Sequence, residues 1–220
     1  MKVLCVDTSS TAGSVVLAED SKILGEVNLN SSLTHTSRLL TSIQHILNHV
    51  GLTLNSIDGF SVICGPGSFT GVRLACSVAQ GLSYSLGISA IKVSSLEVMA
   101  EHFNKKYQAK KVVTLVNAHM GQLYLGIFEY EHELSSFSEV GIQIEEFDIS
   151  DFGSETYFVG NGCDLVKKQL NKIKPKIYNH FPQAIDLLNI AKKRLAKGQI
   201  INPEMIVPVY LTGEEHWKKS

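Results

Sequence analysis

The chain has 220 residues, 44% of them apolar, and a formal net charge of −1. This composition supports a buried core and argues against a disordered chain. The near-zero charge argues against binding nucleic acid through overall charge. The longest apolar runs have the length of strands, so no membrane span is expected. The run after Met1 ends at Asp7, which is too short for a signal peptide.

The cysteines indicate a reducing compartment. There are four of them and no Cys-x-x-Cys pair: Cys5, Cys64, Cys76 and Cys163. Such thiols are typical of a cytoplasmic protein that keeps them reduced and mostly buried.

The first three predicted strands are Lys2–Asp7, Ser14–Ala18 and Ile23–Leu29, and their short connections predict an antiparallel meander. This arrangement puts three polar residues at a hairpin tip: Asp7, Thr8 and Ser9. A carboxylate and hydroxyls at such a tip can hold a phosphate or Mg²⁺, or they can close an Asx turn. The pattern alone favours the turn and leaves the other reading open.

A helix is predicted from Thr34 or His35 to about Val50, with Gly51 as its C-cap. Its polar face carries His45 and His49, which have the spacing of two metal ligands on a helix. However, Ile46 stands where His-Glu-x-x-His requires glutamate, so the metalloprotease motif is absent. We therefore interpret this face as solvated or interfacial.

The most distinctive stretch follows the strand Phe60–Cys64. The chain turns through Gly65, Gly67 and Gly71 and then opens a helix from about Val72 to Leu86. A glycine turn at a helix N-terminus suits either an anion or a close approach of two backbones. The spacing matches no Walker loop, dinucleotide fingerprint or nucleophile elbow. Close approach is preferred, and an anion cradle at Gly65 and Gly67 stays open.

The helix after this turn has an unusual small-residue stripe, in which Ala75, Ala79 and Ser83 recur every four residues. Such a stripe lets another helix come close. Gly81 weakens the helix by roughly 1 kcal/mol, which indicates a packing reason for it.

A strand at Ala90–Val93, a helix at Leu96–Phe103 capped by Ser94 or Ser95, and a polar linker at Asn104–Lys111 complete the first half. The second half repeats the plan through these predicted elements: strands Val112–Val116, Leu123–Tyr130, Val140–Ile144 and Tyr157–Val159, and helices Asp164–Leu170 and Pro182–Ala196. It lacks a counterpart of the helix at 35–50. We therefore predict an α/β, actin-like ATPase (ASKHA) fold of duplicated β-β-β-α-β-α domains, 1–104 and 105–220, with the second reduced.

Several motifs resemble the bacterial TsaB (YeaZ) family over nearly the whole chain. They are Val6–Ser9, Gly65–Arg73, Val78–Gly81, Val93–Glu97, Met120–Tyr124, Pro208–Leu211 and Trp217–Lys219. The resemblance implies a non-catalytic scaffold that binds and activates TsaD, with TsaE docking on the pair. The complex forms N6-threonylcarbamoyladenosine next to the anticodon of tRNAs that read ANN codons. ATP/ADP and metal would belong to partner subunits or a shared interface, and tRNA would bind only as part of the complex.

Two departures from the catalytic relative favour this non-catalytic interpretation. TsaD binds its metal through His-x-x-x-His, whereas Ser95 and Met99 stand at the matching positions here. A hydroxyl and a thioether are poor ligands for a catalytic divalent ion, so we interpret Ser95 as a helix N-cap and Met99 as core. Asn117-Ala-His119 replaces the family's Asp-Ala-Arg. We predict no catalytic or metal-binding residue, and the alternative is a metalloprotease or chaperone-like actin-fold ATPase.

The resemblance also implies that the two N-terminal helices pack against the matching pair of TsaD in a heterodimer. The alternative is that they only cover their own sheet. The same face, left unpaired, would form a homodimer. The residues predicted for the interface are Arg38, Leu39, Ser42, Ile43, Leu47, Val72, Ala75, Cys76, Ala79 and Ser83. The last residues, 211–220, are expected to fold back on the first domain.

Overall fold

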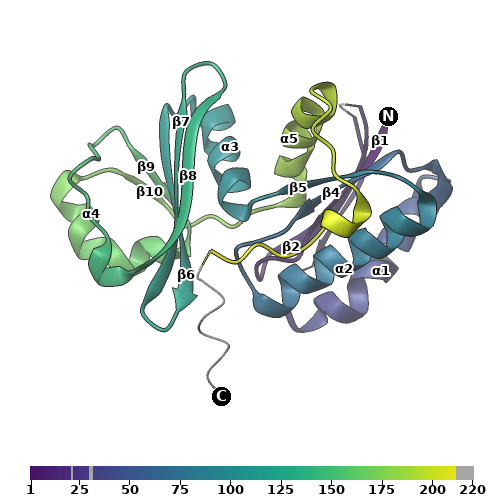
Figure 1. The fold of residues 1–220 in the computed structure, drawn as a ribbon, viewed down its shortest axis with the longest axis horizontal. Coiled ribbons are helices and arrows are strands. Elements are labelled where there is room, and N and C mark those ends of the chain that lie inside the picture. The colour runs from purple at the N-terminus through teal and green to yellow at the C-terminus, as the bar shows by residue number, and fades with distance from the viewer. Residues whose placement is uncertain (21, 30–31, 212–220) are drawn as a thin grey trace. The chain divides into compact units, whose positions relative to one another are not determined.

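The computed structural model describes residues 1–20, 22–29 and 32–211, apart from the side chains of residues 32–37. The chain divides into two compact units (Figure 1). Unit 1 comprises Met1–Val98 and Pro182–Val209, and unit 2 comprises Met99–Phe181 together with Tyr210 and Leu211. The predicted division into 1–104 and 105–220 therefore needs a correction, because residues 182–209 return to the first unit.

Unit 1 is built on a five-stranded sheet with the order β3-β2-β1-β4-β5. Its strands are β1 (Lys2–Asp7), β2 (Gly13–Glu19), β3 (Lys22–Leu29), β4 (Gly59–Ile63) and β5 (Ala90–Val93). The meander β1–β2–β3 is antiparallel, as predicted, whereas β1, β4 and β5 run parallel. Parallel strands require crossover connections, and the helices after β3 and β4 supply them.

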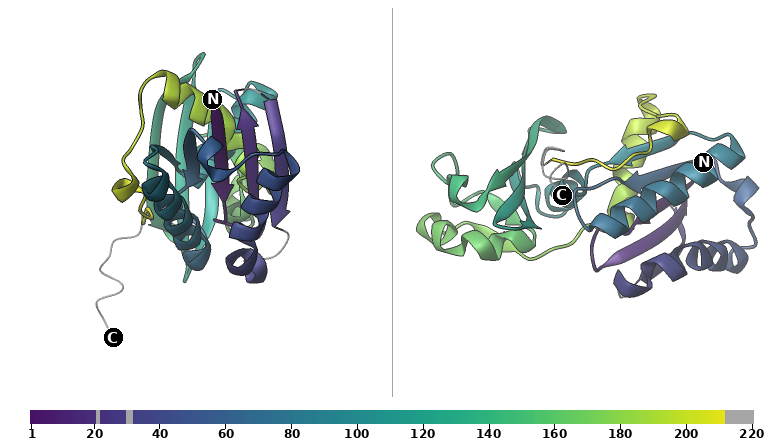
Figure 2. Two further views of the ribbon diagram at one scale, coloured as in Figure 1. Left: turned by 90° about the vertical axis from the view of Figure 1, so that its right-hand side faces the viewer. Right: turned by 60° about the horizontal axis from the view of Figure 1, so that its bottom comes forward.

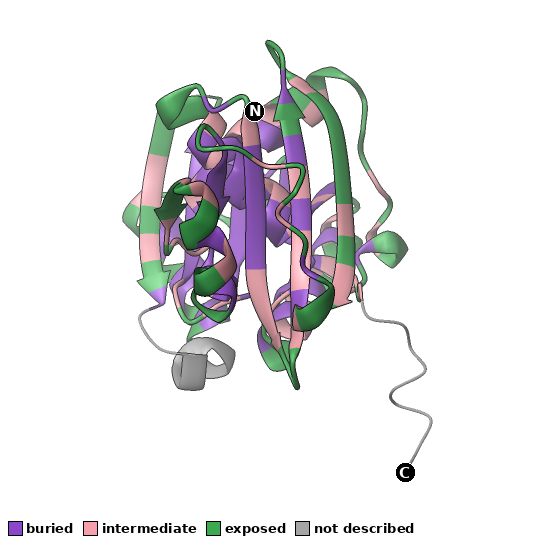
Figure 3. Ribbon diagram, turned by 90° about the vertical axis from the view of Figure 1, so that its left-hand side faces the viewer, coloured by how far each residue is buried: buried purple, intermediate pink, exposed green. Residues whose placement is uncertain are grey.

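Helices cover both faces of this sheet (Figures 1 and 2). On one face, α1 (Ser32–His49) and α2 (Phe69–Leu86) share a core with β1, β2 and β4. On the other face, α5 (Ala184–Ala196) and the start of α3 (Ser95–Tyr107) pack on the same strands. Strands buried on both sides read as continuous apolar runs. Figure 3 shows the buried residues concentrated along the inner strands, with exposed residues on outer helix faces.

Unit 2 repeats the topology with the strand order β10-β9-β6-β7-β8. Its strands are β6 (Lys111–His119), β7 (Gln122–Tyr130), β8 (Leu134–Gln143), β9 (Tyr157–Val159) and β10 (Lys176–Tyr178). The pairs β6–β7 and β7–β8 are antiparallel, and β6–β9 and β9–β10 are parallel. A 3₁₀ turn at Asn161–Val166 and the helix α4 (Lys167–Ile173) cover one face.

Unit 2 is reduced, as predicted. Only a 3₁₀ turn, Ile144–Glu146, forms between β8 and β9, where unit 1 has the helix α1. The other short turns are Leu54–Ser56 and Pro203–Met205, both in unit 1. Within the described residues, no helix is both long and apolar enough to cross a membrane.

Two local predictions were wrong. The first half of the linker predicted at 104–111 is helix, because α3 continues to Tyr107 and buries Phe103. The edge strand β10 was missed, since it is three residues long, partly exposed and directly preceded by Pro175. It pairs with β9 as β5 pairs with β4, which completes the repeat.

Candidate functional site

The hairpin tip after β1 lies against the glycine turn that opens α2. The backbone N–H of Ser68 donates to the carbonyl oxygen of Ser9 at 2.7 Å. The hydroxyl of Thr8 donates to the carbonyl oxygen of Gly71 at 2.6 Å. Two motifs far apart in the sequence are thus joined by short hydrogen bonds at the carboxyl ends of β1 and β4.

The glycines of this turn are required by the closeness of that contact. A Cβ at Gly67 would lie 2.4 Å from the carbonyl oxygen of Ser9, and one at Gly71 only 1.8 Å from that of Thr8. Both neighbours are backbone atoms, which cannot rotate away as a side chain can. Close backbone approach, the preferred of the two sequence interpretations, is therefore what the turn provides.

Backbone N–H groups at the tip and the turn are used within unit 1, whereas the buried hydroxyl of Ser9 has no partner among the described residues. The N–H of Ser9 donates to Asp7 Oδ1 at 2.7 Å and closes an Asx turn. The N–H of Gly71 donates to the Ser68 hydroxyl at 3.3 Å, which caps α2. An anion would need donors such as these, and here they are used within the unit.

Asp7 is nevertheless an unusual residue. It is fully buried, and Oδ2 has no hydrogen-bond partner among the described residues. Burial raises the pKa of this carboxyl to about 7, while the hydrogen bond from the backbone N–H of Ser9 opposes the rise. Asp7 therefore titrates near neutral pH and carries a desolvation cost whenever it is ionised.

The start of α3 contacts the glycine turn and decides between the two predicted caps. Ser94, rather than Ser95, acts as the capping side chain, since its hydroxyl accepts the N–H of Leu96 at 3.1 Å. Ser95 is buried, and its hydroxyl donates to the carbonyl oxygen of Pro66. Met99 is buried, as predicted. Both positions where the catalytic relative has histidines thus carry structural side chains.

Unit 2 repeats this arrangement. A Cβ at Gly160 would lie 2.3 Å from the carbonyl oxygen of Leu115, so this glycine turn also lies directly against a strand. At the hairpin tip, the N–H of Asn117 donates to Asn161 Oδ1 at 3.0 Å, and the N–H of His119 donates to Asn117 Oδ1 at 2.8 Å. The amide Asn117 takes the place that Asp7 has in unit 1, so this tip has no carboxylate.

The residues predicted for the partner interface belong mainly to the core of unit 1. All but one are buried: Leu39, Ser42, Ile43, Leu47, Val72, Ala75, Cys76, Ala79 and Ser83. Only Arg38 is exposed. The small-residue stripe of α2 brings this helix close to its own sheet and to α1. Because these side chains are buried within unit 1, an interface made of them is contradicted.

The opposite face of α2 is open. It presents Thr70, Ser77, Gly81 and Tyr84, and Tyr84 is 74% exposed. A Cβ at Gly81 would meet nothing within 4 Å. On the neighbouring helix α1, Leu40 is 56% exposed. The packing reason expected for Gly81 is thus absent within the described residues of the chain.

The two histidines of α1 lie on its exposed side. The rings of His45 and His49 stack with their centroids 6.5 Å apart. Among the described residues, no further His, Cys, Asp or Glu completes a ligand set with them. Their arrangement fits the predicted solvated or interfacial face.

All four cysteines are free and buried, as predicted. Burial raises the pKa of Cys5 and of Cys163 to about 12. Cys64 and Cys76 form a pair, in which the hydrogen bond to Cys64 lowers the pKa of Cys76. All four thiols are packing residues. Cys5 lies in β1, Cys64 directly after β4, Cys76 in α2, and Cys163 in the 3₁₀ turn after β9.

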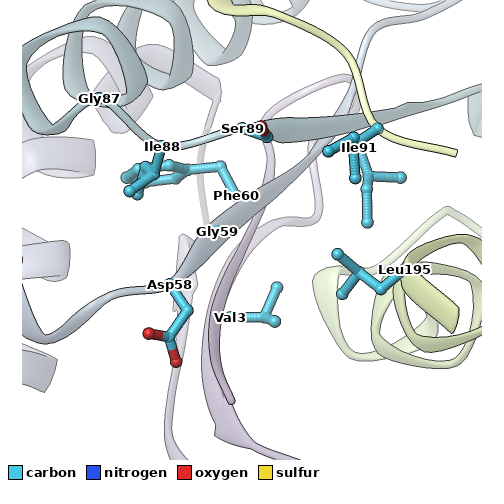
Figure 4. Close-up of a pocket in the computed structure, with 10 residues that line it drawn as sticks. Val3, Asp58, Gly59, Phe60, Gly87, Ile88, Ser89, Ile91 and Leu195 are labelled. Carbon is cyan, nitrogen blue, oxygen red and sulfur yellow. The ribbon is translucent and has the colours of Figure 1, made fainter. Parts of the chain in front are cut away.

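A cavity of about 290 Å³ lies at the amino ends of β1, β4 and β5, the end of the sheet remote from the glycine turn (Figure 4). Its walls include Val3, Phe60 and Leu195. Its carboxylate, Asp58, already accepts the backbone N–H of Lys2 at 2.5 Å. Ligand pockets normally combine apolar walls with several convergent polar groups, and this cavity lacks them among the described residues.

Two units with one repeated topology, each with a glycine turn against a hairpin tip, define the class of actin-like ATPase folds. A family model described as "TsaD: tRNA N6-adenosine threonylcarbamoyltransferase" matches residues 22–215. The tRNA threonylcarbamoyladenosine biosynthesis protein TsaB of Haemophilus influenzae is 31% identical over 229 residues, which cover 100% of this chain and 97% of that one. TsaB of Escherichia coli is 31% identical over 100% of this chain and 98% of its own length.

Solved structures agree with these relatives. YeaZ from Pseudomonas aeruginosa has a TM-score of 0.81 at 28% identity and covers 95% of this chain and 100% of its own. A second Pseudomonas aeruginosa protein, described as similar to peptidase YeaZ, has a TM-score of 0.84 at 29% identity, covering 96% of this chain and 99% of its own. The chain belongs to the TsaB family, within the wider group that the TsaD family model describes.

Proposed function

We propose that this protein is a non-catalytic subunit of the machinery that forms N6-threonylcarbamoyladenosine in tRNA, and that it binds and activates TsaD. Its relatives of similar length are named as tRNA threonylcarbamoyladenosine biosynthesis proteins, which supports the pathway. The finer role rests on two observations: Ser95 and Met99 are used structurally, and one face of α2 is exposed.

The side chains at the hairpin tip and the glycine turn support a subunit without chemistry of its own. The hydroxyl of Ser95 is used to tie α3 to the glycine turn, and Met99 is buried in the core. The backbone N–H groups of Ser9, Ser68 and Gly71 are satisfied within unit 1. We therefore assign ATP, ADP and metal to partner subunits or to an interface shared with them, and we expect TsaE to dock on the heterodimer rather than on this chain alone.

The observation that supports a docking surface on α2 is the exposure of Gly81. An exposed glycine in the middle of an 18-residue helix costs about 1 kcal/mol relative to alanine, and no described atom of this chain lies near the space above it. With Ser77 one turn away, it leaves a shallow path for the backbone of another helix. Leu74 and Tyr84 border this path and supply apolar area.

The test is co-expression with TsaD from the same organism, followed by size-exclusion chromatography. Gly81→Arg fills the path without entering the core, so we expect the heterodimer to be lost while the circular dichroism of the variant stays unchanged. Asn171→Arg, on the exposed side of α4, adds the same charge elsewhere and should leave the heterodimer intact. Unchanged co-elution of Gly81→Arg would refute this docking surface.

Activation is tested with the same proteins. The rate of threonylcarbamoyl transfer to tRNA by TsaD should rise when the wild-type chain is added and should not rise with Gly81→Arg. The chain alone should turn over no ATP; appreciable hydrolysis by the purified chain would contradict the scaffold and favour an actin-fold ATPase. If the same face pairs in the absence of TsaD, the homodimer should also be lost in Gly81→Arg.

A further inference from the structure

Unit 2 carries an aromatic cluster that the proposed function does not use. Three tyrosines stack at the edge of its sheet: the ring centroids of Tyr107 and Tyr157 are 5.7 Å apart, and those of Tyr107 and Tyr178 are 5.6 Å apart. Phe103 also belongs to the cluster, with its ring centroid 5.5 Å from that of Tyr107. Tyr107 is 38% exposed, so its ring forms part of the outer surface.

Two lysines lie against rings of this cluster, and a third follows it closely in the sequence. Lys106 Nζ lies 5.3 Å from the ring centroid of Tyr107, and Lys176 Nζ lies 4.6 Å from that of Tyr157. Lys110 is exposed three residues after Tyr107. We call this set the tyrosine–lysine patch: Lys106, Tyr107, Lys110, Tyr157, Lys176 and Tyr178. Of its lysines, Lys176 is paired with Glu155 at 3.4 Å, whereas among the described residues no ion pair is found for Lys106 or Lys110.

Charge is unevenly distributed along the sequence of unit 2, and the patch is locally basic through Lys106 and Lys110, since Lys176 is paired with Glu155 of the acidic segment. Lysines occur at the end of α3, in the turn before β6 and at β10. Acidic residues instead concentrate between residues 129 and 155, from the end of β7 through the 3₁₀ turn before β9. A chain with a net charge of −1 can therefore still present one positive surface.

We propose that the tyrosine–lysine patch is a contact surface for unpaired nucleotides of RNA. Lys106 and Lys110 would neutralise phosphates, and the exposed ring of Tyr107, fixed by its stacked neighbours, would receive an unstacked base. Loops of folded RNA offer such bases, and aromatic rings beside cations are the usual means of holding them. The choice of RNA rests on the proposed function, which places the chain in a tRNA-modifying assembly.

An acidic peptide is the competing partner, and the exposed aromatic ring argues against it. A carboxylate-rich segment would need the lysines and would gain little from the face of a tyrosine ring. With only two unpaired lysines, the patch would bind weakly alone, with a dissociation constant around 10⁻⁴–10⁻⁶ M, as sequence-independent contacts do. It would add to the affinity of the whole complex rather than determine it.

The test uses the full chain and a fluorescein-labelled transcript of a tRNA that reads an ANN codon, titrated by fluorescence anisotropy at several salt concentrations. Lys106→Ala/Lys110→Ala should weaken binding and lower the slope of log affinity against log salt by about 1.5. The matched control, Lys22→Ala/Lys197→Ala, removes two exposed lysines from unit 1 and should leave the slope unchanged.

The aromatic contact is tested separately. Tyr107→Ala should weaken binding by about 5-fold or more, whereas Tyr107→Phe keeps the ring and should bind as wild type does. Polyglutamate replaces tRNA in a parallel titration. Absence of tRNA binding by the wild type, equal loss in the two lysine pairs, or a polyglutamate affinity that matches tRNA and ignores Tyr107→Ala would each overturn the proposal.

Failure of this patch can be told apart from failure of the proposed function. The lysine variants are also co-expressed with TsaD, and because they change unit 2 whereas Gly81 belongs to unit 1, the heterodimer should persist. Loss of RNA binding with intact pairing supports both inferences. Pairing without any effect of the variants on RNA overturns the patch alone.

Discussion

The contact between the glycine turn and the first hairpin can be tested with one substitution made at two positions of α2. Gly71 and Gly81 lie ten residues apart on the same helix, and neither has a left-handed φ angle. Alanine is therefore acceptable to the backbone at both sites. Only the surroundings differ: at Gly71 the new Cβ would lie 1.8 Å from the carbonyl oxygen of Thr8, and at Gly81 it would meet nothing within 4 Å.

The expected magnitudes follow from what each change disturbs. To admit a methyl group at position 71, the start of α2 must move away from the hairpin tip. That movement strains three hydrogen bonds: Thr8 hydroxyl to Gly71 carbonyl, Ser68 N–H to Ser9 carbonyl, and Gly71 N–H to Ser68 hydroxyl. At about 1 kcal/mol each, we expect Gly71→Ala to lower the free energy of unfolding by roughly 2–4 kcal/mol. Gly81→Ala should raise it by about 1 kcal/mol through helix propensity alone.

The measurement is urea unfolding followed by circular dichroism, supported by thermal midpoints. For a chain of this size, 1 kcal/mol shifts the midpoint by about 2–4 °C, so the two variants should move in opposite directions by clearly resolved amounts. If Gly71→Ala lowers the free energy of unfolding by less than about 1 kcal/mol, close backbone approach is not the reason for that glycine. The anion-cradle interpretation of the turn would then be favoured.

Two further predictions concern charged groups of unit 1. Burial raises the pKa of Asp7 to about 7, so the contribution of this residue is most favourable below pH 4 and is lost as the pH rises from about 4 to 7. Asp7→Asn should therefore stabilise the fold at pH 8 by up to about 4 kcal/mol and flatten this part of the stability–pH curve; chemical denaturation at pH 4, 6 and 8 measures it, and parallel curves for both proteins would contradict the assignment. Glu97→Gln weakens the pair of bonds that Arg194 makes to Glu97 at 2.7 and 2.8 Å, which ties α5 to the start of α3. A loss of about 1–3 kcal/mol is expected in urea unfolding, against no change for the exposed control Glu204→Gln, and an equal effect of the two would show that the ion pair is not what matters.

For the predicted interface residues, helical periodicity indicated close packing but not the element they pack against. A small-residue stripe at Ala75, Ala79 and Ser83 correctly indicated close packing on α2. Periodicity does not say which neighbour approaches, however, and here it is the chain's own sheet and α1. The substitution Ala79→Arg would place a charged side chain in this core, so it would disturb folding and could not report on partner binding. The residues that could meet a partner, Ser77 and Gly81, lie on the opposite side of the same helix.

Ser95 illustrates a second limit. A serine before an apolar helical run is a good N-cap candidate, and two adjacent serines stand there. The position of the chain at the end of β5 decides which serine caps the helix. The hydroxyl of Ser94 accepts the N–H of Leu96, whereas the hydroxyl of Ser95 donates to the carbonyl oxygen of Pro66, about thirty positions earlier in the chain. No local signal carries that contact.

The C-terminal segment is a third case. The chain from 182 to 209 follows unit 2 in sequence but packs in unit 1, where Val209 donates its N–H to the carbonyl oxygen of Cys64 at 2.8 Å. Its amphipathic helix was predicted, yet its partner was not. The expectation that the last residues return to the first domain concerns mainly 212–220, which lie outside the described residues.

By itself, the sequence determined the order and type of nearly all elements, the duplicated plan, the buried thiols and the absence of the catalytic relative's histidine ligands. These features follow from periodicity, turn chemistry and residue identity, all of which are local. Only the tertiary structure decided that the glycine turn closes on Thr8 and Ser9, that the small stripe faces inward and that Gly81 is left open. Those outcomes depend on which surfaces meet, and burial is a property of pairs of elements that no single segment encodes.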